Sequence, residues 1–153
     1  MPAIDTLLYQ ARLASMPAPV ALEPPLPNVS RAALRDTWHA SRAGGRRHEG
    51  IDIFAANGTP VHATTEGILI RHGQNSLGGK VVWVRGPAGQ RHYYAHLSGF
   101  ALVAPGERIE PGRVIGYVGN TGNAKNTPAH LHYGIYTRTG AINPFPLLRQ
   151  VLD

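Results

Sequence analysis

Two closely spaced pairs of residues in this chain could hold a metal ion. His48 and Asp52 lie four positions apart, and His130 and His132 lie two apart. On an extended strand an even separation places both side chains on one face, so each pair can aim at a single point. Hydrolytic zinc sites use three ligands from imidazole and carboxylate groups and leave a position for water. Spacing alone leaves two readings open, a metal site and a chance pairing of structural side chains.

Proton transfer needs further side chains beside such a site. His96, together with the member of the His130 and His132 pair that does not bind metal, could accept a proton from water or hydrogen-bond an oxyanion. The chain contains no cysteine, so thiolate ligands, cysteine nucleophiles and disulfides are excluded. Any metal must therefore use histidine, aspartate or glutamate. The chain has four other histidines, His39, His62, His72 and His92.

The elements that must position these residues are predicted to be strands. The chain has 18 glycines and 13 prolines, which suit many short strands joined by turns. Residues 80–86 and 91–97 alternate in polarity around a glycine and proline turn, which predicts a hairpin. In the first of these segments Trp83 alternates with valines and is expected in the core or on the sheet surface. Helical periodicity is largely absent between residues 48 and 138, so the predicted fold class is mainly β, with an antiparallel sheet.

Residues 1–29 are predicted to differ from the β domain. Apolar residues recur there at helical spacing, at Ile4, Leu7, Leu8 and Ala11. We expect a short N-terminal helix, followed by an extended linker at residues 17–27, where proline is too dense for a helix or a central strand. The predicted division is therefore 1–29 for helix and linker and 30–153 for the domain. A helical turn is expected within residues 31–38 and a short helix in the tail.

Charge and hydropathy narrow the possible partners. The formal net charge of +6 favours an acidic polymer, either nucleic acid or an anionic cell-wall polymer. Nucleic acid is disfavoured because the chain lacks the interleaved aromatic and basic residues that stack bases. No apolar run approaches the roughly 20 residues needed to span a bilayer. The first residues include Asp5 and lack a basic start, so no signal peptide is visible, and oligomeric state is not predicted.

Four motifs in order resemble a known family. They are HEGID at 48–52, YAHL at 94–97, GNTG at 119–122 and HLHYG at 130–134. Together they resemble the M23 family of zinc metallopeptidases, the lysostaphin-like or LytM-like group, from about Arg35 to Pro146. The resemblance implies a compact antiparallel β domain with zinc in a groove and a peptide of bacterial peptidoglycan as substrate. It also implies action outside the cytoplasm, in the periplasm, at the cell envelope or after secretion.

Carried over by position, the resemblance implies two different roles, metal binding and catalysis, for the residues of these motifs. His48, Asp52 and His132 correspond to the ligands of one zinc ion. His96 and His130 correspond to the catalytic residues that deprotonate water and stabilise the tetrahedral intermediate. All these positions are filled as in an active enzyme.

The resemblance also suggests finer expectations. Asn75 falls where family members often carry a polar residue that lines the substrate groove, although Asn75 could equally support a turn. The basic residues Arg42, Arg46 and Arg47 could attract an acidic stem peptide or simply solvate a loop. Residues 120–136 are more similar to Gram-negative members than to glycyl-glycine cutters, which suggests cleavage of D-alanyl–meso-diaminopimelyl crosslinks. The alternative is a non-catalytic LytM-like regulator of another wall hydrolase, which usually lacks ligands.

Overall fold

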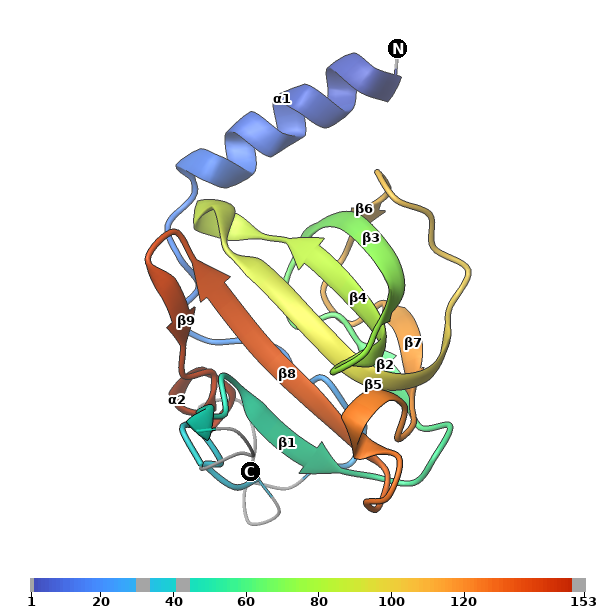
Figure 1. The fold of residues 1–153 in the computed structure, drawn as a ribbon. Helices are drawn as coiled ribbons and strands as arrows, with labels where there is room; N and C mark the ends of the chain where they lie inside the picture. Colours follow the sequence, from blue (N-terminus) through green and yellow to red (C-terminus); the bar gives the residue numbers. More distant parts are fainter. Residues whose placement is uncertain (1, 30–33, 41–44, 150–153) are drawn as a thin grey trace.

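A computed structural model describes residues 2–29, 34–40 and 45–149. Within this part of the chain two α-helices lie at the ends and β-strands lie between them (Figure 1). The helices are α1 (Pro2–Ser15) and α2 (Phe145–Arg149), with short 3-10 turns η2 (Pro87–Gly89) and η3 (Gly122–Ala124). The strands are β1 (Ile51–Phe54), β2 (Pro60–His62), β3 (Gly67–Asn75), β4 (Gly79–Arg85), β5 (Arg91–Phe100), β6 (Arg108–Ile109), β7 (Val114–Val118), β8 (His130–Thr137) and β9 (Gly140–Ile142).

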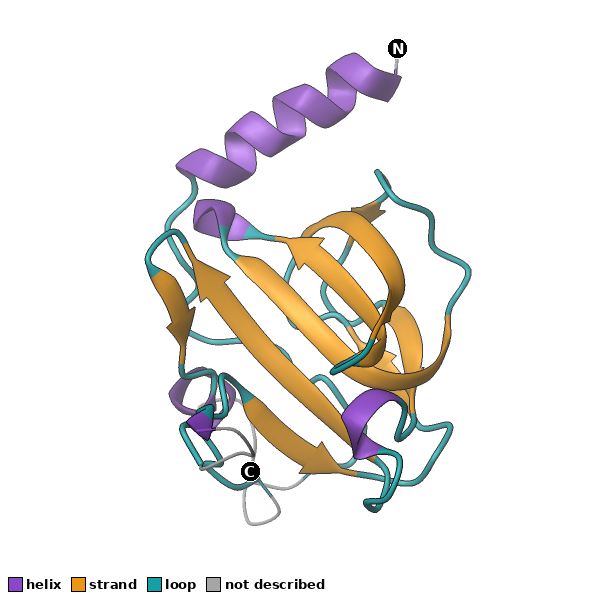
Figure 2. Cartoon of the chain, viewed as in Figure 1, coloured by secondary structure: helices purple, strands orange, loops and turns teal. Residues whose placement is uncertain are grey.

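The strands form an antiparallel sheet, which confirms the predicted fold class. The main order is β1-β8-β5-β4-β3-β6, while β7 pairs with β2 and β5, and β9 pairs with β8. Figure 2 shows how strands make up the body of the molecule, with helices only at its margins. The predicted hairpin is present as β4 and β5, joined through η2.

Strand alternation separates a core face from an open face. On β8, Leu131, Tyr133 and Ile135 are fully buried and belong to the main hydrophobic core. His130, His132 and Tyr136 lie at the intervening positions and point to the opposite face. β1 repeats this pattern, with Ile51 and Ile53 in the core and Asp52 and Phe54 on the open face. The open face of these paired strands carries the candidate site.

The predicted linker packs against the domain. Residues 17–27 form neither helix nor strand, as expected from their prolines. Leu22 and Leu26 are nevertheless buried in the main core, and burying a leucine side chain contributes about 1.5–3 kcal/mol. The backbone N–H of Glu23 donates to the carbonyl of Thr64 at 2.9 Å. The predicted division at residue 29 therefore separates two segments that are in contact.

Helix α1 is present, but the four apolar residues whose spacing predicted it are exposed. Ile4, Leu7 and Leu8 are 56%, 64% and 65% exposed. The helix instead buries Tyr9 and Leu13 against Ile68 of β3. Tyr9 Oη donates to Glu66 Oε1 at 2.8 Å, and the guanidinium of Arg108 lies 3.8 Å from the centre of the tyrosine ring, so polar contacts accompany the burial of this face.

Two smaller expectations concern the segments beside the sheet. The expected helical turn at residues 31–38 falls partly on residues 31–33, which lie outside the described residues, and residues 34–38 form no helix. The short helix expected in the tail is present as α2. In the described part of the chain, no helix combines the length and the apolar character needed to cross a membrane.

Candidate metal centre

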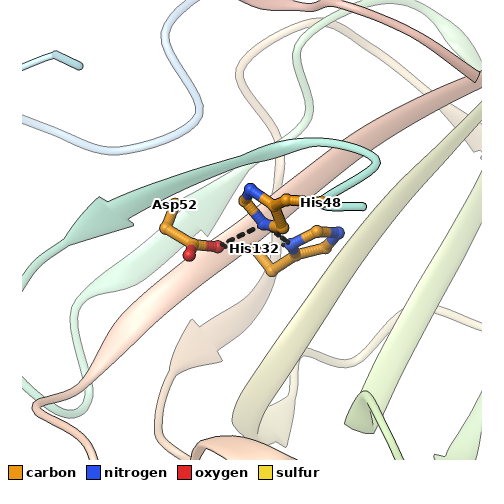
Figure 3. Close-up of side chains that lie close together, drawn as sticks. All are labelled: His48, Asp52 and His132. Carbon is orange, nitrogen blue, oxygen red and sulfur yellow. Dashed lines mark hydrogen bonds and ion pairs between the residues drawn. The ribbon is translucent and has the colours of Figure 1, made fainter. Parts of the chain in front are cut away.

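His48, Asp52 and His132 bring three ligand atoms together on the open face of the sheet (Figure 3). His48 Nε2 lies 3.0 Å from Asp52 Oδ1, and His132 Nδ1 lies 3.2 Å from the same oxygen. The two ring nitrogens are 2.8 Å apart. Asp52 and His132 are directly opposite each other on β1 and β8, which explains why residues 80 positions apart meet.

These separations fit a tetrahedral zinc ion. Ligands at the usual zinc distances of about 2.0–2.1 Å are about 3.3 Å from one another in tetrahedral geometry. The three separations of 2.8, 3.0 and 3.2 Å are slightly shorter than that value. Two imidazoles and one carboxylate also match the ligand types of hydrolytic zinc sites. The residues present therefore fit a zinc ion.

His48 reaches the site from a loop, not from the strand that the spacing suggested. It precedes β1, and its backbone pairs with the segment before it, with His39 N to His48 O at 2.7 Å and His48 N to Ala40 O at 3.0 Å. Gly50 then lets the chain pass very close to β8. A Cβ atom there would lie 2.6 Å from the carbonyl oxygen of Tyr133 and 2.8 Å from Cε1 of His132. Glycine at this position is thus required by the close approach.

Hydrogen bonds on the far side of the ligands hold them in place. His48 Nδ1 donates to the carbonyl oxygen of Thr37 at 2.8 Å, which leaves Nε2 with its lone pair toward the site. The backbone N–H of Asp52 donates to Thr37 Oγ1 at 2.9 Å. Thr37 therefore supports two of the three ligands. No feature of the sequence pointed to this residue.

Burial and charge favour the ligand forms of these side chains. Burial alone raises the pKa of Asp52, but hydrogen bonds and charges from His132 and His48 outweigh it and hold that pKa far below its ordinary range. Burial lowers the pKa of His132, with smaller opposing contributions from Asp52. An ionised carboxylate and a neutral imidazole are the forms that bind a metal ion.

His96 faces the groove because of an irregularity in β5. Lys80 of β4 pairs with Leu97 and Val82 pairs with Tyr94, so β5 holds one extra residue between these pairs, a β-bulge. His96 has a φ of 64°, in the left-handed region that non-glycine residues rarely adopt. Tyr94 and Leu97 remain in the core, while His96 lines the groove. Strict alternation could not have predicted this orientation.

His96 and His130 present the same ring nitrogen to the site. His96 Nδ1 donates to the carbonyl oxygen of Thr121 at 2.8 Å, and His130 Nδ1 donates to that of Pro128 at 3.0 Å. Both Nε2 atoms are thereby left as acceptors. His130 Nε2 lies 3.9 Å from Asp52 Oδ1. The imidazole rings of His96 and His130 pack edge to face, with 5.0 Å between their centroids. Burial lowers the pKa of His96 to about 4, so its ring is neutral at neutral pH.

The GNTG segment owes its position to close backbone contact. Thr121 Oγ1 donates to the carbonyl of Leu97 at 2.7 Å and accepts from the N–H of Lys80 at 3.0 Å. A side chain at Gly79 would collide with Thr121 and Gly122. The motif therefore fixes the carbonyl that orients His96. The sequence showed the motif but not this function.

The site lies in a groove of about 840 Å³, a size typical of ligand sites. Its walls include the side chains of the centre and three aromatic rings for which the sequence suggested no functional role, those of Trp83, Tyr93 and Tyr136. The other four histidines do not line it, and His92 is fully buried in the core. The basic residues Arg46 and Arg47 also line the groove, whereas Arg42 lies outside the described residues.

Asn75 lies at the end of β3 and supports the turn into β4. Its Oδ1 accepts the N–H of Gly78 at 2.6 Å. Its side chain also hydrogen-bonds Tyr93, whose pKa is raised mainly by burial. Gly78 and Tyr93 line the groove, and Asn75 contacts both. A direct role for Asn75 in binding substrate stays a prediction.

Comparisons with known proteins agree with this geometry. The model of peptidase family M23 matches residues 46–144. The L-Ala–D-Glu endopeptidase of Bacillus subtilis is 43% identical over 82% of this chain and 42% of its own length. The DD-carboxypeptidase/endopeptidase Mpg of Neisseria meningitidis is 40% identical over 65% of this chain and 22% of its own length. The chain thus spans less than half the length of these curated relatives.

The fold also matches solved structures. The catalytic domain of the antimicrobial peptidase lysostaphin from Staphylococcus simulans superposes with a TM-score of 0.64 at 29% identity, covering 76% of this chain and 89% of that one. Family match, fold and ligand geometry coincide over the same residues. The chain belongs to peptidase family M23 and keeps an intact metal-binding group at His48, Asp52 and His132.

Proposed function

We propose that this chain is a zinc-dependent endopeptidase that hydrolyses peptide bonds in bacterial peptidoglycan, outside the cytoplasm. One observation carries the proposal. Three ligand atoms lie within 4.8 Å of one another in a groove that the rings of His96 and His130 also line. A regulator without catalytic activity does not need this complete arrangement. The family membership and the named activities of the relatives support the substrate class.

The side chains divide the chemistry as follows. His48, Asp52 and His132 would hold the zinc ion, which supplies a Lewis acid that polarises the scissile carbonyl and acidifies water. The Nε2 atoms of His96 and His130 are acceptors at the open side of the ligand group, fixed by their bonds to backbone carbonyls. One of them accepts a proton from the attacking water. Once protonated, an Nε2–H donates to the oxyanion that forms.

The side chains described above can carry out the proton transfers that hydrolysis of a peptide bond requires. The water oxygen adds to the carbonyl carbon, and one water proton moves to an imidazole Nε2. That imidazole returns the proton to the amide nitrogen as the C–N bond breaks. The products are a carboxylic acid and an amine, and transfer of the second water proton between them gives a carboxylate and an ammonium group. The orientation of His96 and His130 is thus as necessary as the metal ligands.

Two bonds are candidates for cleavage. The GNTG to HLHYG segment favours the D-alanyl–meso-diaminopimelyl crosslink, and the named activity of the Neisseria relative is of the DD type. The Bacillus relative, with the higher identity and coverage, is named for the L-Ala–D-Glu bond of the stem peptide. We place the crosslink first and the stem bond second. Both occur in peptidoglycan peptides, so one experiment separates them.

The test uses isolated sacculi and purified muropeptides with zinc-loaded protein. We expect wild type to release fragments, a chelator to stop the reaction and His132→Ala to abolish both zinc binding and release. His72→Ala is a matched control because His72 is exposed and does not line the groove. Mass spectrometry of the products identifies the bond. Full activity of His132→Ala, or release unaffected by the chelator, would refute the assignment.

A further inference from the structure

One wall of the groove is an aromatic row across three strands. Trp83 of β4 is directly opposite Tyr93 of β5, with 4.3 Å between ring centroids. Tyr136 of β8 completes the row at 5.5 Å from Trp83 and 6.3 Å from Tyr93. All three rings line the groove, and Tyr93 lies 5.9 Å from the ring of His132. The row therefore begins beside a metal ligand and continues away from it.

Two arginines lie on this aromatic row. The Cζ atom of Arg71 is 5.9 Å from the centre of the Trp83 ring, and that of Arg91 is 5.8 Å from the centres of both Trp83 and Tyr136. These distances are those of cation–π contacts. A guanidinium stacked on a ring keeps its N–H edges available for a further hydrogen-bonding partner.

The two guanidinium groups have no acidic partner in the described part of the chain. Neither Arg71 nor Arg91 lies within 4.0 Å of a carboxylate there. Glu49 also lines the groove, but it forms no ion pair with either of them. Arg91 is in addition directly opposite Arg85 across β4 and β5. Like charges placed opposite each other destabilise a sheet, so this arrangement favours binding of an anion.

We propose that Trp83, Tyr93, Tyr136, Arg71 and Arg91 form a subsite for a free carboxylate of the substrate peptide. We name this group the arginine subsite. Its aromatic row supports the peptide chain, and its arginines bind the carboxylate through charge-assisted hydrogen bonds. Arg71 and Arg91 do not themselves line the groove, and the aromatic row connects them to it. The inference rests on the proposed function, because it assigns a preference to a substrate bound in that groove.

The position of the subsite limits where that carboxylate lies. Tyr93 and Arg91 are two and four residues along β5 from Ala95, which is directly opposite His132. Those separations correspond to about 7 and 13 Å of strand. An extended peptide advances about 3.3–3.6 Å per residue. The carboxylate therefore belongs to a residue within about two to four positions of the scissile bond.

This requirement separates classes of wall peptide by chemistry. A glutamyl residue within a chain keeps one free carboxylate, and a crosslinked diaminopimelyl residue keeps one as well. A bridge made only of glycine carries none. The arginine subsite therefore favours cleavage at bonds that have an acidic residue within about two to four positions, as in the peptides that contain both candidate bonds, and disfavours glycine bridges.

The test compares two versions of one substrate. A crosslinked stem-peptide dimer is prepared with free glutamyl and diaminopimelyl carboxylates and, separately, with these groups as carboxamides. Zinc-loaded wild type, Arg71→Gln, Arg91→Gln and the double variant are assayed on both. Arg12→Gln is the single-charge control, because Arg12 is exposed on α1 and, unlike Arg71 and Arg91, makes no cation–π contact with the aromatic row. Calorimetry measures binding of each dimer to the wild type and to the His130→Ala variant.

We expect wild type to prefer the free acid by about tenfold or more in kcat/KM. Each single variant should lose about tenfold on the acid, and the double variant should cleave both dimers at the rate wild type shows for the carboxamide. Equal cleavage of the two dimers by wild type would overturn the inference, as would a double variant that loses activity equally on both. If neither dimer is cleaved, the proposed function fails separately. Calorimetric preference for the acid would then still support the subsite, and equal or undetectable binding would refute it.

Discussion

The Nδ1 atom of His96 lies 2.8 Å from the carbonyl oxygen of Thr121, and that contact depends on the threonine side chain. Thr121 Oγ1 bonds the backbone on both sides, at Leu97 and at Lys80. The carbonyl is therefore fixed relative to the two strands that flank the bulge. The orientation of the His96 imidazole therefore depends on the Thr121 hydroxyl group, whose hydrogen bonds are to Leu97 and Lys80 and not to His96.

Thr121→Val should lower kcat with little effect on KM. The substitution keeps the size of the side chain and removes both hydrogen bonds, so the carbonyl that orients His96 loses its support. We expect a fall in kcat of about tenfold, equivalent to about 1.4 kcal/mol, and unchanged zinc stoichiometry. Thr139→Val, in the exposed turn after β8, is the control. A matching loss in the control, or loss of zinc, would contradict the assigned role.

Zinc should stabilise the protein in a way that separates ligands from proton-transfer residues. At a free zinc concentration about 1,000 times Kd, binding contributes about 4 kcal/mol, which corresponds to a Tm increase of roughly 10 °C for a chain of this size. We expect His48→Ala and His132→Ala to lose most of this increase and His96→Ala and His130→Ala to retain it. Thermal unfolding with zinc and with chelator measures each shift. The division of labour is wrong if all four variants respond alike.

Gly50→Ala should disturb the metal centre from the backbone side. The added methyl group would meet the Tyr133 carbonyl and the His132 ring, so β1 and β8 must separate. We expect a loss of about 2–3 kcal/mol in the free energy of unfolding and weaker zinc binding by about tenfold or more. Gly73→Ala is the matched control, since a Cβ there meets nothing within 4 Å. Denaturant unfolding and zinc titration provide the two measurements.

His92 should make stability depend on pH. Burial lowers its pKa from 6.5 to about 4, and its Nε2 has no hydrogen-bond partner among the described residues. The folded state therefore keeps the ring neutral while the unfolded state binds a proton below pH 6.5. Stability from this residue is complete above pH 6.5 and is lost as pH falls toward 4.

The corresponding variant is His92→Phe, compared with wild type in chelator at pH 7 and pH 5. Relative to wild type, the variant should gain about 2 kcal/mol in unfolding free energy between these two values. Taking the difference removes the titration of the metal ligands, which both proteins share. A difference that does not change with pH would show that His92 is not the titrating group.

The sequence predicted the strands well because their alternation follows burial. β1, β8 and the β4–β5 hairpin appear where polarity alternates or a turn intervenes. The ligand group could be found from motif order and spacing, since Asp52 and His132 are on paired strands. His48 reaches these two residues from a loop instead of a strand, and Gly50 allows that loop to pass close to β8.

The remaining features depend on contacts that no local pattern encodes. The buried side of α1 is the one that carries Tyr9 and Leu13, which pack against Ile68, and the Tyr9 hydroxyl donates to Glu66, 57 residues away in the sequence. The φ of His96 arises from a bulge set by pairing with β4. Thr37 acts partly through its backbone carbonyl, which carries no signature of residue type. Trp83 was expected in the core or on the sheet surface, and only register places it beside Tyr93 and two arginines.

The alternation along β8 makes stability and specificity separately adjustable. Leu131, Tyr133 and Ile135 face the core, while His130, His132 and Tyr136 face the groove. Substitutions at the odd-numbered positions should reduce the yield of folded protein, whereas Tyr136 can be changed without repacking the interior. A library confined to the groove-facing positions beyond the ligands could therefore retarget the enzyme to other peptides while preserving its scaffold.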